Sequence, residues 1–208
     1  MISLKIESSK EFEFRRVKYT LGKMEWFEKN GYKPLLPMDK SAKEFDGLAD
    51  EDIKKLIDSE FNENEYKVPE KYIFEHWNLF SNSLEECLKI INKNYLSGYT
   101  IFFTKYGVAG SYHVPNSIVI NIKMKFEKGM MRTICHEIIH LNIEKLIEKY
   151  NIPHWLKERA VDLTMVKYLP DLSKPQDIKI NTEDFDKIFE ENFPDMEKIM
   201  DLAKTLKV

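Results

Sequence analysis

Two histidines placed four residues apart around a glutamate are the most chemically suggestive group in this sequence. The segment reads His136, Glu137, Ile138, Ile139, His140, which is an HExxH pattern. In a helix both imidazoles lie on one face and can bind the same metal ion. Glu137 is turned by about 100 degrees from His136, which suits a general base better than a third ligand. HExxH also arises by chance in amphipathic helices, so its surroundings matter.

The residues around the motif predict a buried helix. From Ile134 to Leu141 the motif itself supplies the only charged or histidine side chains. Three such side chains in a buried segment cost several kcal/mol unless they are paired or bound to a metal. Cys135 precedes His136, but a single cysteine without a CxxC spacing is more often small core filler, and we leave it out of the site.

A second predicted helix, residues 153–169, offers acidic partners. Glu158 and Asp162 share one stripe with apolar residues, namely Trp155, Val161, Met165, Val166 and Leu169. Two buried carboxylates four residues apart repel each other and would sooner bind protons than stay ionised without a cation nearby. A zinc ion and an imidazole N–H would satisfy both. The alternative is that they pair with Lys or Arg from a neighbouring element.

Together, residues 107–169 resemble the gluzincin metallopeptidases typified by thermolysin, which combine HExxH with Glu-x-x-x-Asp on the next helix. The resemblance implies that His136, His140 and Glu158 bind one Zn²⁺. It also implies that Glu137 is the general base and acid, and that Asp162 orients His136. The short interval between His140 and Glu158 is similar to that of compact minigluzincins.

Two other zinc-site patterns fit this sequence less well. The metzincin pattern is absent, since Ile143 and Leu146 stand where that family needs Gly and His. His154 is a rival third ligand, as in zincins that use a late histidine, but it lies at the start of its helix. The pair Glu158 and Asp162 is therefore preferred.

The resemblance further implies that an edge strand about 25 residues before HExxH holds the peptide substrate. The residues at this place are Gly110, Ser111, Tyr112 and His113. The alternative is that Gly107 and Gly110 only form a hairpin turn. The oxyanion-stabilising donor stays open: Tyr150 and His154 are possible, and Tyr112, His113 and Tyr168 are also chemically able.

Hydrophobic periodicity predicts the elements that position these residues. Helical spacing recurs over residues 11–30, 50–61, 68–94, 127–150, 153–169, 185–189 and 196–206, and alternation over residues 99–124 predicts two or three antiparallel strands. We expect an α+β, zincin-like fold, with a small antiparallel sheet on the HExxH helix and additional helices at both ends. Residues 1–96 form a mainly helical region, 97–170 the catalytic core and 171–208 a helical tail, together one compact unit.

Composition narrows the function class. Of 208 residues, 32% are charged but nearly balanced, with a net charge of -3 and no long block of one sign, so we expect no nucleic-acid partner. No stretch has the pattern of a signal peptide or the length of a membrane span, and Cys87 and Cys135 form no disulfide framework. We expect a cytoplasmic protein without membrane contact; no pattern indicates its oligomeric state.

These features predict a zinc-dependent metallopeptidase that acts on a peptide or protein. The alternative is a zincin-fold regulatory or binding module with weak, latent or no peptidase activity. Retention of Glu137 argues against that alternative, because a dead site could lose its base and keep its metal. A third possibility is a zymogen-like state in which a terminal segment covers the cleft.

Overall fold

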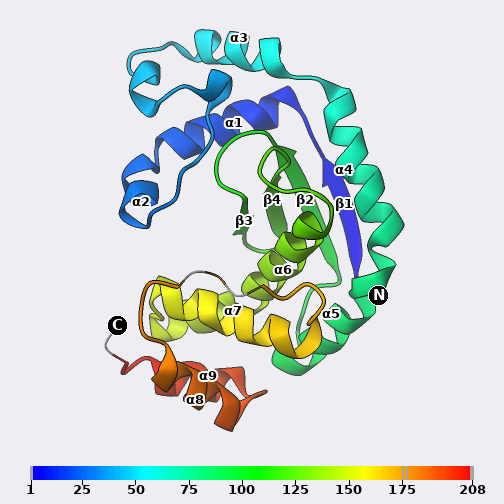
Figure 1. Ribbon diagram of the computed structural model, residues 1–208, viewed down its shortest axis with the longest axis vertical. Helices are drawn as coiled ribbons and strands as arrows, with labels where there is room; N and C mark the ends of the chain where they lie inside the picture. Colours follow the sequence, from blue (N-terminus) through cyan, green and yellow to red (C-terminus); the bar gives the residue numbers. More distant parts are fainter. Residues whose placement is uncertain (1, 175, 177, 207–208) are drawn as a thin grey trace.

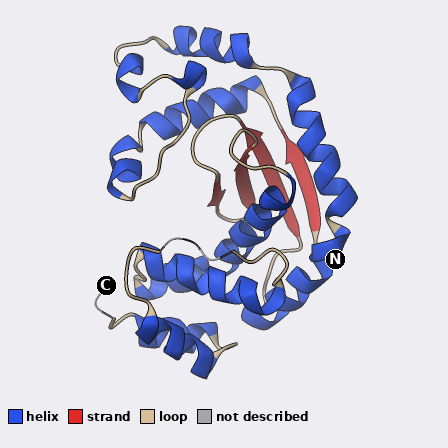
Figure 2. Cartoon of the chain, in the orientation of Figure 1, coloured by secondary structure: helices blue, strands red, loops and turns tan. Residues whose placement is uncertain are grey.

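The computed structural model describes residues 2–174, 176 and 178–206, and it confirms the α+β class (Figures 1 and 2). Within these described residues, nine α-helices surround one four-stranded mixed sheet. Residues 1, 175, 177 and 207–208, which belong to the predicted N-terminal region and tail, lie outside the described residues.

The sheet is mixed, so the prediction of an antiparallel sheet was wrong. Its order is β1 (Ser3–Glu7), β2 (Gly98–Thr104), β4 (Ser117–Asn121) and β3 (Gly110–His113). Only β3 and β4 pair antiparallel, as a hairpin, whereas β2 is parallel to both β1 and β4. The physical reason is that β4 lies between β2 and β3. After β2 the chain first forms β3 at the edge of the sheet. It then turns back through the hairpin, so that β4 runs beside β2 in the same direction as β2.

Strand β1 was not predicted, although its residues alternate. Leu4 and Ile6 pack against the core, and Ile6 pairs with Ile101 of β2. The indole Nε1 of Trp77 donates to the carbonyl of Ile2 at 3.0 Å. Because the partner strand lies far along the chain, local sequence gives no sign of this pairing.

Helix α6 (Glu127–Tyr150) carries HExxH and has the predicted bounds. It contacts β3, β4 and the helices α4, α5, α7 and α9, so it is buried on most of its surface. Ile134, Ile138 and Ile139 have no exposed area. Asn151 caps the C-terminal end of the helix with a left-handed φ of 50°. Asparagine tolerates this backbone conformation well.

The remaining helices follow the predicted periodicity, but two predicted stretches divide. Residues 11–30 form two helices separated by Gly22 and Lys23, and residues 68–94 fall in two helices that meet at Trp77. The bounds are α1 (Lys10–Leu21), α2 (Met24–Lys29), α3 (Asp50–Glu60), α4 (Glu63–His76), α5 (Asn78–Ile91), α7 (His154–Tyr168), α8 (Glu183–Asn192) and α9 (Met196–Ala203).

One large hydrophobic core joins the three predicted regions. It includes Ile2 and Ile73 from the first region, Phe103 from the sheet, and Phe189 from the tail. A smaller cluster under α1 and α3 contains Val17 and five other residues, namely Leu36, Phe45, Ile53, Ile57 and Tyr106. In Figure 1 α1–α3 lie at one end of β3 and α7–α9 at the other.

Among the described residues, no helix is long and apolar enough to cross a membrane.

Candidate metal centre

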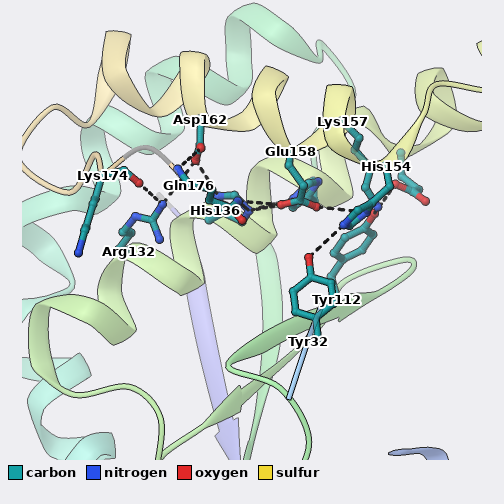
Figure 3. Close-up of polar contacts among 12 residues, drawn as sticks. Tyr32, Tyr112, Arg132, His136, His154, Lys157, Glu158, Asp162, Lys174 and Gln176 are labelled. Atoms are coloured by element: carbon teal, nitrogen blue, oxygen red, sulfur yellow. Dashed lines mark hydrogen bonds and ion pairs between the residues drawn. The ribbon is translucent and has the colours of Figure 1, made fainter. Parts of the chain in front are cut away.

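Three donor atoms from two helices converge on one point (Figure 3). The Nε2 atoms of His136 and His140 lie 3.0 Å apart, and Glu158 Oε2 lies 3.2 Å from the first and 3.3 Å from the second. The two histidines come from consecutive turns of α6, and Glu158 from the second turn of α7. All three side chains are buried. The structure thus brings together the three predicted ligands.

The donor set fits a zinc ion. Two imidazole nitrogens and a carboxylate oxygen are common zinc ligands, and donors about 2.1 Å from one ion in tetrahedral geometry stand about 3.4 Å apart. The observed separations of 3.0–3.3 Å are close to this value. The other imidazole nitrogens, Nδ1 of His136 and of His140, are buried without a hydrogen bond to any described residue. Both imidazoles therefore direct Nε2 toward the shared point.

Asp162 lies behind His136, where a group that orients the imidazole is needed. Its Oδ1 is 3.8 Å from His136 Nδ1 and 3.4 Å from a guanidinium nitrogen of Arg132. Its Oδ2 accepts a hydrogen bond from the backbone N–H of Gln176 at 2.7 Å. From the sequence, Asp162 has two alternative partners, an imidazole or a basic side chain from a neighbouring element. In the structure Asp162 has both beside it.

Glu137 is buried at the edge of the same cluster and lines its pocket. A Cβ added to Gly110 of β3 would lie 2.7 Å from Glu137 Oε1 and 2.3 Å from Thr133 Cγ2. Only glycine allows the strand to come this close to α6. The backbone of β3 thus forms one wall of the space in front of the Glu137 carboxylate.

Burial and mutual charge separate the pKa values of the cluster. Burial raises the pKa of Glu137 to about 7 and lowers the pKa of His140 to about 4. For Glu158 burial favours protonation, but the charge and hydrogen bonds of His140 and His136 outweigh it and hold its pKa well below the usual value. Glu158 is therefore the anion of the cluster, while Glu137 has the proton affinity of a general base at neutral pH.

Gln176 also belongs to the site, and it was not predicted from the sequence. It lies on the connection between α7 and α8, and its Nε2 donates to Glu158 Oε2 at 2.8 Å and lies 3.3 Å from His136 Nε2. Its backbone N–H also binds Asp162. A glutamine in a polar connection has no distinguishing pattern, so only the folded chain could place it here.

His154 faces the cluster but has a different partner. Its Nε2 is 3.0 Å from the hydroxyl of Tyr32, and its Nδ1 is 3.8 Å from Glu158 Oε1. Trp26 packs edge-on against the same imidazole, with ring centres 5.5 Å apart. Two aromatic residues from the region around α2 thus complete the site beside His154, and neither was predicted.

Tyr112 stacks on His140, with ring centres 5.0 Å apart and nearly parallel planes. Its hydroxyl donates to Glu144 at 2.5 Å and accepts from Lys157 Nζ at 3.0 Å. Burial, followed by the nearby Glu144 carboxylate, raises the pKa of the Tyr112 hydroxyl. Tyr112 therefore stays neutral and packs its ring against that of His140.

Only some of the residues predicted to bind substrate or to stabilise the oxyanion line the pocket. Gly110, Ser111, Tyr112 and His154 line the pocket, whereas His113 is exposed at the end of β3. The hydroxyl of Tyr150 donates to Glu197 at 3.3 Å. Tyr168 packs on Phe193. Neither Tyr150 nor Tyr168 is among the pocket residues.

The cluster opens into a pocket of about 580 Å³. Residues of α1, α2, β3, α6 and α7 line it, together with Gln176; in Figure 1 α2 and α7 lie on opposite sides of β3. A volume of this size is typical of small-molecule and peptide-residue sites. The converging donors therefore face a space large enough for a substrate.

Comparisons of the chain with protein family models, curated proteins and solved structures found no match.

Proposed function

We propose that this chain is a zinc-dependent metallopeptidase with a zincin-like arrangement of α6, α7 and the sheet. The observation that carries the proposal is the convergence of His136, His140 and Glu158 on one point, with donor atoms within 4.8 Å of one another. Glu137 and a large pocket lie beside them. Zinc held by these three residues would activate a water and polarise a carbonyl.

The chain's own residues would then divide the work. Glu137 takes the proton of the attacking water at its carboxylate and delivers it to the leaving amine nitrogen. Asp162 keeps His136 in its orientation, and the ring of Tyr112 holds His140. His154, paired with Tyr32, lies on the side of Glu158 opposite to His136 in Figure 3. It can donate a hydrogen bond to a developing oxyanion.

A peptide is favoured as substrate because β3 is an edge strand. It pairs with β4 on one side only, and Gly110, Ser111 and Tyr112 line the pocket. The hydroxyl of Ser111 is buried without a hydrogen-bond partner among the described residues. An extended peptide could pair with the free edge of β3, with its carbonyl groups beside Glu137.

The test is the zinc content of the purified protein, with cleavage of a mixed peptide library as the second readout. We expect one zinc per chain in the wild type, loss of zinc in Glu158→Ala, and retained zinc without cleavage in Glu137→Gln. Glu148→Ala and Glu148→Gln, at an exposed position of α6, are the matched controls. Zinc bound equally well by wild type and Glu158→Ala would refute the assigned ligand set.

The position of Gln176 favours a second candidate function, in which the chain is a latent form of the same peptidase. Its carboxamide contacts both Glu158 and His136, and Gln176 lines the pocket. We expect Gln176→Ala to keep the zinc content and to raise cleavage, because the obstructing side chain is gone. Gln176→Glu, which keeps the length, is the matched control. Equal or lower cleavage by Gln176→Ala would remove the support for latency.

A further inference from the structure

A buried arginine that forms no side-chain hydrogen bond to a described residue lines the pocket. Arg16 of α1 is 3% exposed, and its three guanidinium nitrogens form no hydrogen bond to a described residue. Burial lowers the pKa of this guanidinium, yet arginine stays charged in proteins. An unpaired buried charge is costly, so such a group is expected to have an anionic partner at some stage.

The groups around Arg16 are occupied elsewhere. Glu13, one turn earlier on α1, accepts hydrogen bonds from Tyr66, Thr104 and the backbone N–H of Lys105. The carbonyl of Gly107 accepts from the backbone N–H of Leu35 and from Asn121. Glu13 and the carbonyl of Gly107 are therefore already used as acceptors, and the charge of Glu137 acts on the guanidinium without a hydrogen bond to it.

The chain also leaves space for the guanidinium. A Cβ on Gly107 would lie 2.5 Å from Arg16 Nε, and this glycine has a φ of +79°, which other residues rarely adopt. On another side the ring of Tyr19 lies 5.4 Å from Arg16 Cζ. Tyr19 also lines the pocket and is 42% exposed, so the ring beside the guanidinium can be reached from the pocket.

The charge of the whole pocket has the same sign as Arg16. Five basic residues and three glutamates line it, although the chain as a whole has a net charge of -3. Two of the basic residues have partners, since Arg132 lies against Asp162 and Lys157 donates to Tyr112. Among the glutamates, Glu158 lies against His136 and His140. The pocket thus attracts anions, and among its described basic residues Arg16 is a buried one whose guanidinium forms no hydrogen bond.

We propose that Arg16 binds a carboxylate of the substrate, and that the preferred peptides carry a free carboxyl group near the cleaved bond. This inference rests on the proposed peptidase function. A guanidinium and a carboxylate form two parallel hydrogen bonds, which a neutral amide of the same shape cannot replace. The carboxylate belongs either to the C-terminus of the peptide or to an Asp or Glu side chain.

Binding of matched peptides tests the proposal and separates the two sources. The probes are acetyl-Ala-Ala-Ala with a free C-terminus, its C-terminal amide, and the C-terminal amides of acetyl-Ala-Asp-Ala and acetyl-Ala-Asn-Ala. Calorimetry is done at low temperature on the purified protein, and chromatography verifies that the peptides stay intact. We expect the acid of one pair to bind about 10- to 100-fold more tightly than its amide.

The variants show whether Arg16 makes the distinction. Arg16→Gln should remove the preference for the acid, Arg16→Lys should keep part of it, and Arg15→Gln, at an exposed position of α1, should keep all of it. Thermal unfolding verifies that each variant is folded. A wild type that binds acid and amide equally, or a preference that survives in Arg16→Gln, would overturn the proposal.

The alternative role for Arg16 is to balance the charge of Glu137. In that case Arg16→Gln would slow cleavage of acid and amide peptides by the same factor and leave their relative binding unchanged, which would also overturn the proposal. Failure of the peptidase function has a different signature. An acid preference that depends on Arg16, in a protein that binds no zinc and cleaves nothing, would refute the peptidase and keep the carboxylate site.

Discussion

Replacing Gly110 with alanine tests how closely β3 must approach α6. The new Cβ would lie 2.3 Å from Thr133 Cγ2 and 2.7 Å from Glu137 Oε1. Carbon atoms in contact stand at least about 3.5 Å apart, so strand and helix must separate locally by about 1 Å. Glu137 has to move with the strand or turn away from the pocket.

The size of the effect follows from this displacement. Overpacking a well-packed contact costs about 1–3 kcal/mol of unfolding free energy. A misplacement of about 1 Å at a reacting group costs about 100-fold in rate, equivalent to about 2.7 kcal/mol of transition-state stabilisation. None of the three donor atoms at the metal centre is among the three atoms nearest to the added Cβ. We therefore expect Gly110→Ala to keep its zinc and to lose about two orders of magnitude in kcat/KM.

Urea unfolding, zinc analysis and peptide cleavage measure these effects separately. Gly129→Ala is the matched control, because its nearest neighbour is 3.8 Å away and alanine in a helix should stabilise by about 0.5–1 kcal/mol. The double variant Gly110→Ala, Thr133→Ser lacks the methyl group that clashes. It should recover most of the stability but less of the rate, because the contact with Glu137 remains.

Wild-type activity and stability in Gly110→Ala would refute the close packing of β3 on α6. Loss of zinc in this variant would instead show that the strand supports the ligands, contrary to the geometry derived above.

Two further predictions concern buried carboxylates. Asp162→Asn should weaken zinc affinity about 10- to 100-fold by leaving His136 poorly oriented; a chelator competition against the exposed control Asp171→Asn measures this, and equal affinities would refute the role of Asp162. Burial raises the pKa of Glu13 above 4.5, so the folded chain holds this proton more tightly than the unfolded chain and loses stability as pH rises from about 4.5 through the folded pKa. Glu13→Gln does not lose stability in this way. Urea unfolding from pH 4 to pH 8 should therefore show that the stability of the variant relative to wild type rises across that window and then levels off. A difference in stability that stays constant with pH would contradict the raised pKa of Glu13.

The local elements were predicted well because their signals are short-range. The bounds of α6 follow from its apolar residues and from Asn151, which ends the helix with a left-handed backbone. The start of α7 follows from Pro153. By contrast, the pairing of β1 with β2 depends on residues more than 90 positions apart, and no local pattern encodes it.

The candidate ligands follow from the amino-acid sequence, because an i, i+4 spacing on a helix places two side chains on one face. This spacing pairs His136 with His140, and the apolar stripe of the next helix singles out Glu158 and Asp162 as its acidic residues. The residues around these ligands follow from the tertiary fold. Gln176 reaches the cluster from a connection, and Tyr32 and Arg16 reach the pocket from the N-terminal helical region. Their positions depend on how distant segments pack, which side-chain spacing along the chain does not specify.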